Sequence, residues 1–246
     1  MENRLDGFAD AYGESFNYHD ENMAMLQWYS RRVIDCIRAR KMGSVVSLGI
    51  GHRIVSKSIL AETGEQLQKY LIIEGSAEII SQYRQEVPAS DKLQILNCLF
   101  EEFTTTETFD AIEMGFVLEH VEDPSMLIAK FAAYLKPGGT VFFAVPNARS
   151  VHRLIGHSAG MLDDLYRLSN SDLELGHLRY FDLESLISTI LRAGLKIVKK
   201  EGIYLKPFST SQLKSLALPE EVQAALFKVG RDYPEITNAI YVEAVS

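Results

Sequence analysis

The hydrophobic residues of this chain gather in short, nearly continuous runs that polar segments of helical length separate. A run that is apolar at almost every position is typical of a strand buried on both faces of a sheet. The pattern predicts strands at 44–50, 69–75, 92–98, 109–115 and 139–145. Two further strands are predicted near the C-terminus, at 195–205 and 239–245.

Segments of helical length stand before, between and after these strands. They cover residues 21–40, 53–62, 76–86, 123–135 and 182–193. Lys136-Pro137-Gly138-Gly139 is predicted to stop the fourth helix, because proline and glycine do not continue a helix. The alternation predicts a Rossmann-like, doubly wound α/β fold with a mostly parallel seven-stranded sheet.

The chain has no repeat and no Pro-, Gly- or Ser-rich linker, which predicts one domain over residues 1–246. Residues 1–42 are expected to contain the helix at 21–40, and residues 43–147 hold the first five predicted strands. Residues 148–181 form an insertion on the substrate side, because ligands of open α/β sheets bind at the carboxyl ends of strands. Residues 182–246 complete the sheet, and their helical excursion at 208–234 either covers the same opening or makes a homodimer contact.

Composition narrows the class of protein. Hydrophobic residues make up 47% of the chain, enough for a sizeable core. The 25 basic and 33 acidic residues give a net charge of −8, which argues against a general nucleic-acid binder. No apolar stretch reaches the roughly 20 residues of a membrane span, and the N-terminus lacks a signal-peptide pattern. With only Cys36 and Cys98, the chain is expected to be cytoplasmic and bound to neither nucleic acid nor membrane.

A glycine turn follows the first predicted strand. Gly49 and Gly51 stand before a helix, where glycine lets the backbone approach a ligand and the helix start offers N–H donors. Ile54 occupies the third glycine position of a dinucleotide fingerprint, which argues against a nicotinamide-dependent oxidoreductase. Glu74 ends the second strand, where a carboxylate can accept the hydroxyls of an adenosine ribose or, alternatively, stabilise the following helix.

Four motifs in register carry a family resemblance: LGIG (48–51), IIEGS (72–76), FDAIEMGFVLEHVEDP (109–124) and LKPGGTVFFAVPN (135–147). With them the chain resembles class I S-adenosylmethionine-dependent methyltransferases, and most closely the small-molecule branch that includes ubiquinone-biosynthesis-type enzymes. The segment GHLRYFDLESLISTILRAGLKIV (176–198) extends this resemblance. It implies S-adenosyl-L-methionine as cofactor, S-adenosyl-L-homocysteine as product, and a small-molecule or sugar-containing metabolite methylated on oxygen or nitrogen.

The resemblance also implies that residues 1–42 form an N-terminal helical lid and residues 43–147 the cofactor-binding core, and it assigns the residues of a cofactor site. The glycine turn passes the methionine moiety, Glu74 holds the ribose, and the segments after the third and fourth strands border the adenine and the sulfonium. The residues implied are Gly49, Gly51, Glu74, Gly75, Ser76, Asn97, Cys98, Leu99, Met114 and Gly115.

Three positions depart from the family pattern. Ser47 replaces an acidic residue before the glycine turn, Arg53 replaces a glycine after it, and Asn97 or Cys98 replaces an acid beside the adenine amine. Ser47 and Arg53 motivate a second hypothesis: a cofactor-binding homologue that has lost turnover and serves as a regulatory or structural partner.

Histidines are the candidates for the base that removes a proton from the acceptor. His120 and His177 are predicted to be catalytic, with a packing role as the alternative for His120. Predicted substrate contacts come from the aromatic N-terminal lead, which could instead cover a sheet edge, and from the insertion. They are Tyr12, Tyr18, His152, Arg179 and Tyr180. No metal is predicted, because no histidines or carboxylates stand at a metal-ligand spacing such as i, i+4.

Overall fold

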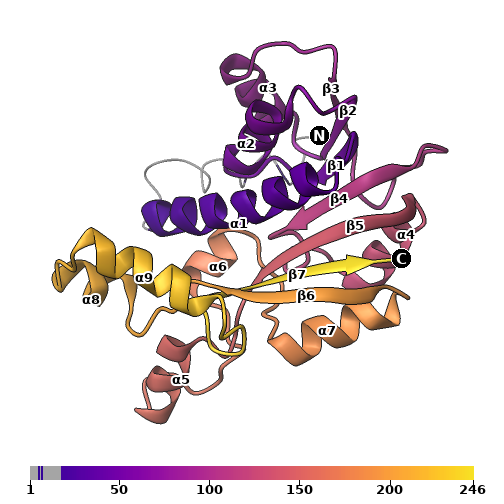
Figure 1. Ribbon diagram of the computed structural model, residues 1–246. Coiled ribbons are helices and arrows are strands. Elements are labelled where there is room, and N and C mark those ends of the chain that lie inside the picture. The colour runs from indigo at the N-terminus through magenta and orange to yellow at the C-terminus, as the bar shows by residue number, and fades with distance from the viewer. Residues whose placement is uncertain (1–4, 6, 8–17) are drawn as a thin grey trace.

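The apolar runs form one seven-stranded sheet in the computed structural model, which describes residues 5, 7 and 18–246 (Figure 1). The strand order is β3-β2-β1-β4-β5-β7-β6. Only the pairs that include β7 are antiparallel. The strands are β1 Ser44–Leu48, β2 Lys69–Glu74, β3 Leu93–Asn97, β4 Phe109–Gly115, β5 Leu135–Pro146, β6 Lys196–Ile203 and β7 Ala239–Val245. The predicted Rossmann-like fold is confirmed.

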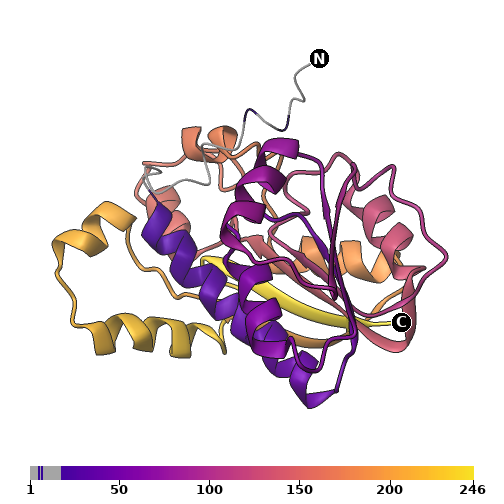
Figure 2. The same cartoon turned by 90° about the horizontal axis from the view of Figure 1, so that it is seen from above.

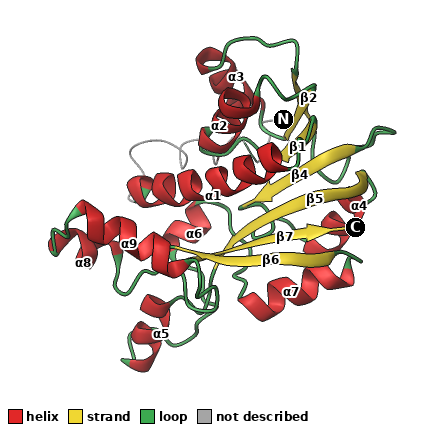
Figure 3. Ribbon diagram, viewed as in Figure 1, coloured by secondary structure: helices red, strands yellow, loops and turns green. Residues whose placement is uncertain are grey.

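Helices cover both faces of this sheet (Figure 3). The described helices are α1 His19–Ala39, α2 Ile54–Thr63, α3 Ala77–Glu86, α4 Pro124–Ala132, α5 Val151–Ser158, α6 Asn170–Glu174, α7 Leu183–Arg192, α8 Thr210–Ser215 and α9 Glu220–Gly230. On one face, α1, α2 and α3 pack over a core that includes Tyr29, Ile59 and Tyr83. On the other, α4 and α7 pack over a core that includes Phe131 and Ile190. Both faces of the central strands are therefore buried, which explains their nearly continuous apolar runs.

One predicted boundary was wrong. The helix expected at 123–135 ends at Ala132, and β5 already begins at Leu135. Leu135 pairs with Phe109 of β4, and the register shifts before Thr140 pairs with Ala111. The segment Lys136-Pro137-Gly138-Gly139 is thus the irregular start of a strand. The pairing of Leu135 with β4 decides this boundary. A helix-stop pattern in the sequence contains no information on strand pairing.

The carboxyl ends of β1, β2, β4 and β5 meet at one edge of the sheet. In Figure 1 this edge is at the left for β4 and β5, and α5, α6, α8 and α9 lie beyond it. The view from above shows α8 and α9 extending sideways from the sheet next to α1 (Figure 2). The helices predicted within 208–234 are therefore present. Within the described part of the chain, no helix is long and apolar enough to cross a membrane.

Candidate functional site

The glycine turn connects β1 to α2 at this edge. Gly49 has a φ of +84° and Gly51 a φ of +49°, both in the left-handed region that glycine adopts without a steric penalty. The backbone N–H of Gly49 donates to the carbonyl of Ile73 at 2.8 Å, which holds the start of the turn against β2. The predicted turn therefore exists with the conformation that its glycines require.

Glu74 links this turn to the one that follows β2. Its Oε2 accepts a hydrogen bond from the backbone N–H of Ile50 at 2.9 Å, and its Oε1 accepts one from Ser76 at 2.8 Å. Its backbone carbonyl accepts from Asn97 Nδ2 and from the Cys98 N–H. The ends of β1, β2 and β3 therefore meet at Glu74, which is only 7% exposed.

Leu5 also reaches this place. A Cβ added at Gly75 would lie 2.5 Å from Leu5 Cδ1 and 3.2 Å from Leu99 Cδ2. Leu99 is itself exposed. Leu5 thus lies over residues predicted to border the cofactor, as a lid would. Tyr12 lies outside the described residues, so its predicted contact stays a prediction.

Two polar residues from β1 and β4 lie side by side beneath the turn. Ser47 pairs in register with Glu113, and its hydroxyl lies 2.9 Å from the hydroxyl of Tyr70. Glu113 accepts hydrogen bonds from the Tyr29 hydroxyl at 2.7 Å and from the Gly115 N–H at 2.8 Å, and burial raises the pKa of its carboxyl. A carboxylate missing at position 47 is therefore present on the neighbouring strand, which the sequence pattern did not reveal.

The structure at the end of β4 limits how Met114 and Gly115 can line the predicted cofactor site. The Met114 side chain is fully buried in the core beneath α4 and α7, so only its backbone can line a ligand site. A Cβ at Gly115 would lie 2.3 Å from the Tyr29 ring. Glycine is required there because the aromatic ring of α1 packs directly on the strand.

Arg53 does not crowd the turn. Its guanidinium forms an ion pair with Glu86 and a hydrogen bond with Gln82, both on α3, so the side chain lies along α3. Its backbone has a φ of +66°, which is strained for a residue with a side chain.

We expect Arg53→Gly to leave cofactor affinity within about threefold of wild type. The substitution removes a partly exposed ion pair, worth up to about 1 kcal/mol, and relieves a backbone strain of about 1 kcal/mol. Calorimetric titration with S-adenosylhomocysteine and urea unfolding measure the two effects. A tenfold gain in affinity would instead mean that the arginine obstructs the site.

A buried polar cluster follows β4 and joins residues far apart in the sequence. Glu119, His120 and His177 each place one potential ligand atom within 4.8 Å of the other two. The rings of His120 and His177 are 4.7 Å apart at their centroids. The Leu178 N–H donates to the Glu119 carbonyl at 2.8 Å and so ties the two segments together. The two histidines predicted to be catalytic are therefore neighbours.

The electrostatics of this cluster depend on burial and on Asp172. Glu119 is completely buried, and burial raises the pKa of its carboxyl to about 7. Burial lowers the pKa of His120 to about 3. Asp172 lies 3.2 Å from Nδ1 of His177. Although burial acts to raise it, hydrogen bonds from His177 and Ser169 hold the pKa of Asp172 at about 2, so Asp172 is an anion at neutral pH.

The predicted substrate residues lie in different surroundings. The Tyr180 hydroxyl donates to Asp172 at 3.0 Å, and Arg179 donates to the carbonyl of Glu122 at 3.0 Å. Within the described ranges Arg179 has no carboxylate within ion-pair distance. Tyr18 is 37% exposed and its ring lies 5.7 Å from Lys206 Nζ. Burial, and then Lys206 and Arg153, lower the pKa of His152 to about 3. Tyr180 and Arg179 thus form hydrogen bonds with other residues of the protein.

Sequence reasoning missed Glu119 and Asp172 as members of the cluster. Glu119 immediately precedes His120, a predicted catalytic histidine, and this position is a signal that could have identified it. Asp172 ends up beside His177 through a tight turn, in which the His177 N–H donates to the Asp172 carbonyl at 2.9 Å.

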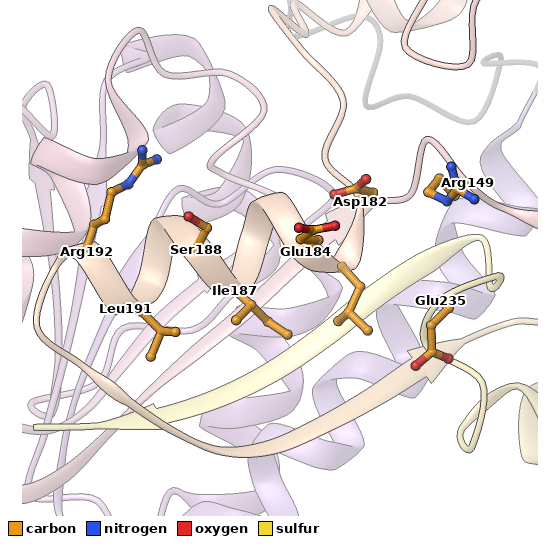
Figure 4. Close-up of a pocket in the computed structure, with 9 residues that line it drawn as sticks. Arg149, Asp182, Glu184, Ile187, Ser188, Leu191, Arg192 and Glu235 are labelled. Atoms are coloured by element: carbon orange, nitrogen blue, oxygen red, sulfur yellow. The ribbon is translucent and has the colours of Figure 1, made fainter.

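A separate groove of about 920 Å³ runs along α7. Figure 4 shows Glu184, Ile187, Ser188 and Leu191 in line along the helix, with Arg149 and Glu235 toward one end. None of the residues predicted to hold the cofactor lines it. The groove is therefore distinct from the glycine turn and from the histidine cluster.

Comparison with known proteins gives a family match over most of the chain. A family model described as a methyltransferase domain matches residues 16–200. A ubiquinone biosynthesis O-methyltransferase of Colwellia psychrerythraea is 24% identical over 206 residues, with 81% of this chain and 82% of the relative covered.

Solved structures share the fold. An S-adenosylmethionine-dependent methyltransferase from Mesorhizobium loti superposes with a TM-score of 0.59 at 16% identity, covering 89% of this chain and 99% of that one. The N-methyltransferase NodS from Bradyrhizobium japonicum, solved with S-adenosyl-L-homocysteine, gives a TM-score of 0.56 at 13% identity, covering 94% and 88%.

Proposed function

The chain belongs to the methyltransferase domain family and is an S-adenosylmethionine-dependent enzyme, and from this premise we propose that it methylates an oxygen or nitrogen atom of a small-molecule or sugar-containing metabolite. The hypothesis of a homologue without turnover finds no support in the comparisons. The side chain of Arg53, which had motivated it, lies along α3. The ubiquinone biosynthesis relatives are named as O-methyltransferases, which favours oxygen over nitrogen.

The observation that carries this proposal is the cluster of Glu119, His120 and His177 at the end of β4. β4 pairs with β1, so the cluster follows the strand next to the glycine turn. A hydroxyl or amine acceptor must lose a proton when it is methylated, and histidine is the side chain most often used for this. We assign acceptor activation to His177 and His120.

The glycine turn and Glu74 fit the proposed cofactor site. Bound S-adenosylmethionine supplies a methyl group on a positively charged sulfur. Gly49 and Gly51 keep side chains away from the backbone on which the methionine moiety would lie. The Glu74 carboxylate is already oriented by the Ile50 and Ser76 amides to receive ribose hydroxyls. Gly75, Ser76, Asn97, Cys98 and Leu99 complete the proposed adenosine side.

Catalysis by these residues consists of alignment, exclusion of water and proton removal. Asp172 orients the ring of His177 through the contact at Nδ1, and Tyr180 and Ser169 in turn hold Asp172. Tyr180 is therefore a positioning residue. Leu5, which lies over Gly75, would help to exclude water from the adenosine side.

Transfer of a labelled methyl group tests the proposal. Purified full-length protein is incubated with methyl-tritiated S-adenosylmethionine and a panel of phenols, catechols, sugars and amines. We expect labelled product from at least one hydroxyl or amine class, at a rate of about 1 per second or slower for a non-native substrate. Transfer only to carbon, or to none of the panel while S-adenosylhomocysteine binds at micromolar concentration, would contradict the acceptor assignment.

The cellular location, the partners and the oligomeric state of the enzyme are also proposals. We place the enzyme in the cytoplasm, with neither nucleic acid nor membrane as a partner, on the basis of its negative charge and its two unpaired cysteines. A homodimer through residues 208–234 is also proposed.

A further inference from the structure

We propose that Glu119, His120 and His177 bind one divalent transition-metal ion, and that this ion holds the acceptor atom. The binding of the ion is independent of the proposed function, and only its role in catalysis rests on that function. The sequence-based expectation was that the protein has no metal.

The geometry of the three side chains fits a cation. One ligand atom from each lies within 4.8 Å of the other two. A transition metal with bonds of about 2.0–2.2 Å places its ligands about 3–4 Å apart, so small side-chain rotations close the site. His120 is partly exposed whereas Glu119 and His177 are buried, so the cluster has one side through which an ion and an acceptor can enter.

The surroundings of Glu119 are the strongest evidence that a cation binds here. Its side chain has no solvent exposure, and neither of its carboxylate oxygens accepts a hydrogen bond from another residue of the described chain. A buried carboxylate without hydrogen-bond donors from the protein is unfavourable. A cation bound by Glu119 and the two histidines would coordinate one or both of these carboxylate oxygens directly.

One nitrogen of His177 faces a carboxylate. Nδ1 of His177 lies 3.2 Å from Oδ1 of Asp172, which leaves Nε2 of the same ring for an ion. Metal-binding histidines characteristically use one nitrogen for the ion and donate from the other to a carboxylate or a carbonyl. Asp172 is fixed in its turn by Ser169 and Tyr180, so the support extends beyond the three ligands.

The donor set indicates the class of ion. Two imidazole nitrogens and one carboxylate oxygen with open positions suit zinc, iron(II), cobalt(II) or manganese(II). Magnesium prefers oxygen ligands and is disfavoured by two imidazoles. These donors do not form a compact sequence motif, because they come from the loop after β4 and from the end of the insertion.

The ion would activate the acceptor in a balanced step. An acceptor hydroxyl would replace water on the metal, and its proton would be released to solvent because the cation stabilises the oxyanion. With the ion bound, His120 and His177 would act through the metal and not as free bases. The lone pair of the acceptor atom then forms a bond to the methyl carbon as the carbon–sulfur bond breaks. That electron pair returns to sulfur and gives S-adenosylhomocysteine.

Metal titration of the full chain tests the proposal. Chelator-treated protein is titrated with zinc chloride by calorimetry and with cobalt chloride by visible absorption, without cofactor or acceptor. We expect one equivalent of each ion at micromolar or tighter Kd, with cobalt bands typical of nitrogen and oxygen ligands. Glu119→Gln and His120→Asn should each weaken binding at least about 100-fold. His157→Ala, which removes an exposed histidine of α5, should bind as wild type does.

Two results would overturn the metal site: no stoichiometric binding by wild type, or equal binding by both variants when circular dichroism shows them folded. Because two separate ligands are replaced, misfolding of one variant leaves the other decisive. Failure of the proposed function is distinct, since it appears as stoichiometric metal binding without transfer to any hydroxyl or amine. Full transfer activity in chelator-treated protein would retain the function and remove the metal from it.

Discussion

His177→Ala is expected to lower turnover by about 10²–10⁴-fold, because His177 is the buried histidine of the cluster, lies beside the Asp172 carboxylate and is the residue to which we assign acceptor activation. The dissociation constant of S-adenosylhomocysteine should change less than about threefold, since His177 belongs to the insertion side and not to the glycine turn. Tritium transfer measures the first quantity, and calorimetry measures the second.

The matched control for this variant is His157→Ala. His157 lies in the same insertion, but it is exposed and its Nδ1 contacts the carbonyl of Leu162. Turnover by His157→Ala should equal that of wild type. Comparable turnover by His177→Ala and wild type would remove His177 from catalysis, and an equal loss in both variants would indicate that any change in the insertion is harmful.

Glu74→Ala is expected to weaken binding of S-adenosylhomocysteine by about 100-fold or more. The substitution removes the carboxylate to which the ribose hydroxyls would donate. Hydrogen bonds to a charged group are worth about 1.5–3 kcal/mol each. The buried amides of Ile50 and Ser76 also lose their acceptor, so the free energy of unfolding should fall by about 1–3 kcal/mol. Calorimetry and urea unfolding measure these two effects.

Two further variants separate the binding role of Glu74 from its structural role. Glu107→Ala removes an exposed carboxylate that pairs with Lys69 and should change neither quantity appreciably. Glu74→Gln keeps an oxygen that can accept from one amide but not from both, so its stability should lie between those of Glu74→Ala and wild type. Wild-type affinity in Glu74→Ala would contradict the assigned ribose contact.

The glycine turn shows how far local pattern can predict a site. Gly49, Gly51 and Glu74 were predicted at the ends of two buried strands, and the structure brings them together through the Ile50 amide. Parallel strands place their carboxyl ends at one edge, so residues after successive strands meet without further information. Whether Arg53 lies over the turn or along α3 depends instead on the position of Glu86, which no local pattern contains.

The histidine cluster shows where local pattern fails. His120 and His177 were each predicted separately, but their contact depends on the hydrogen bond between Leu178 and Glu119. Nothing in the local sequence predicts that Glu119 is buried, and its complete burial comes from tertiary packing. Met114 was predicted beneath the sulfonium, yet its side chain lies in the core, because alternate residues of a strand point to opposite faces.

The fold class, the strands and the family of this protein follow from the sequence, because continuous apolar runs and the motifs between them are local properties of the chain. The tertiary structure was needed to show which polar side chains meet, that Ser47 lies beside Glu113 of the neighbouring strand, and that Glu119 is buried next to two histidines. The physical reason is that burial and charge pairing depend on neighbours in space, which folding brings together from separate segments.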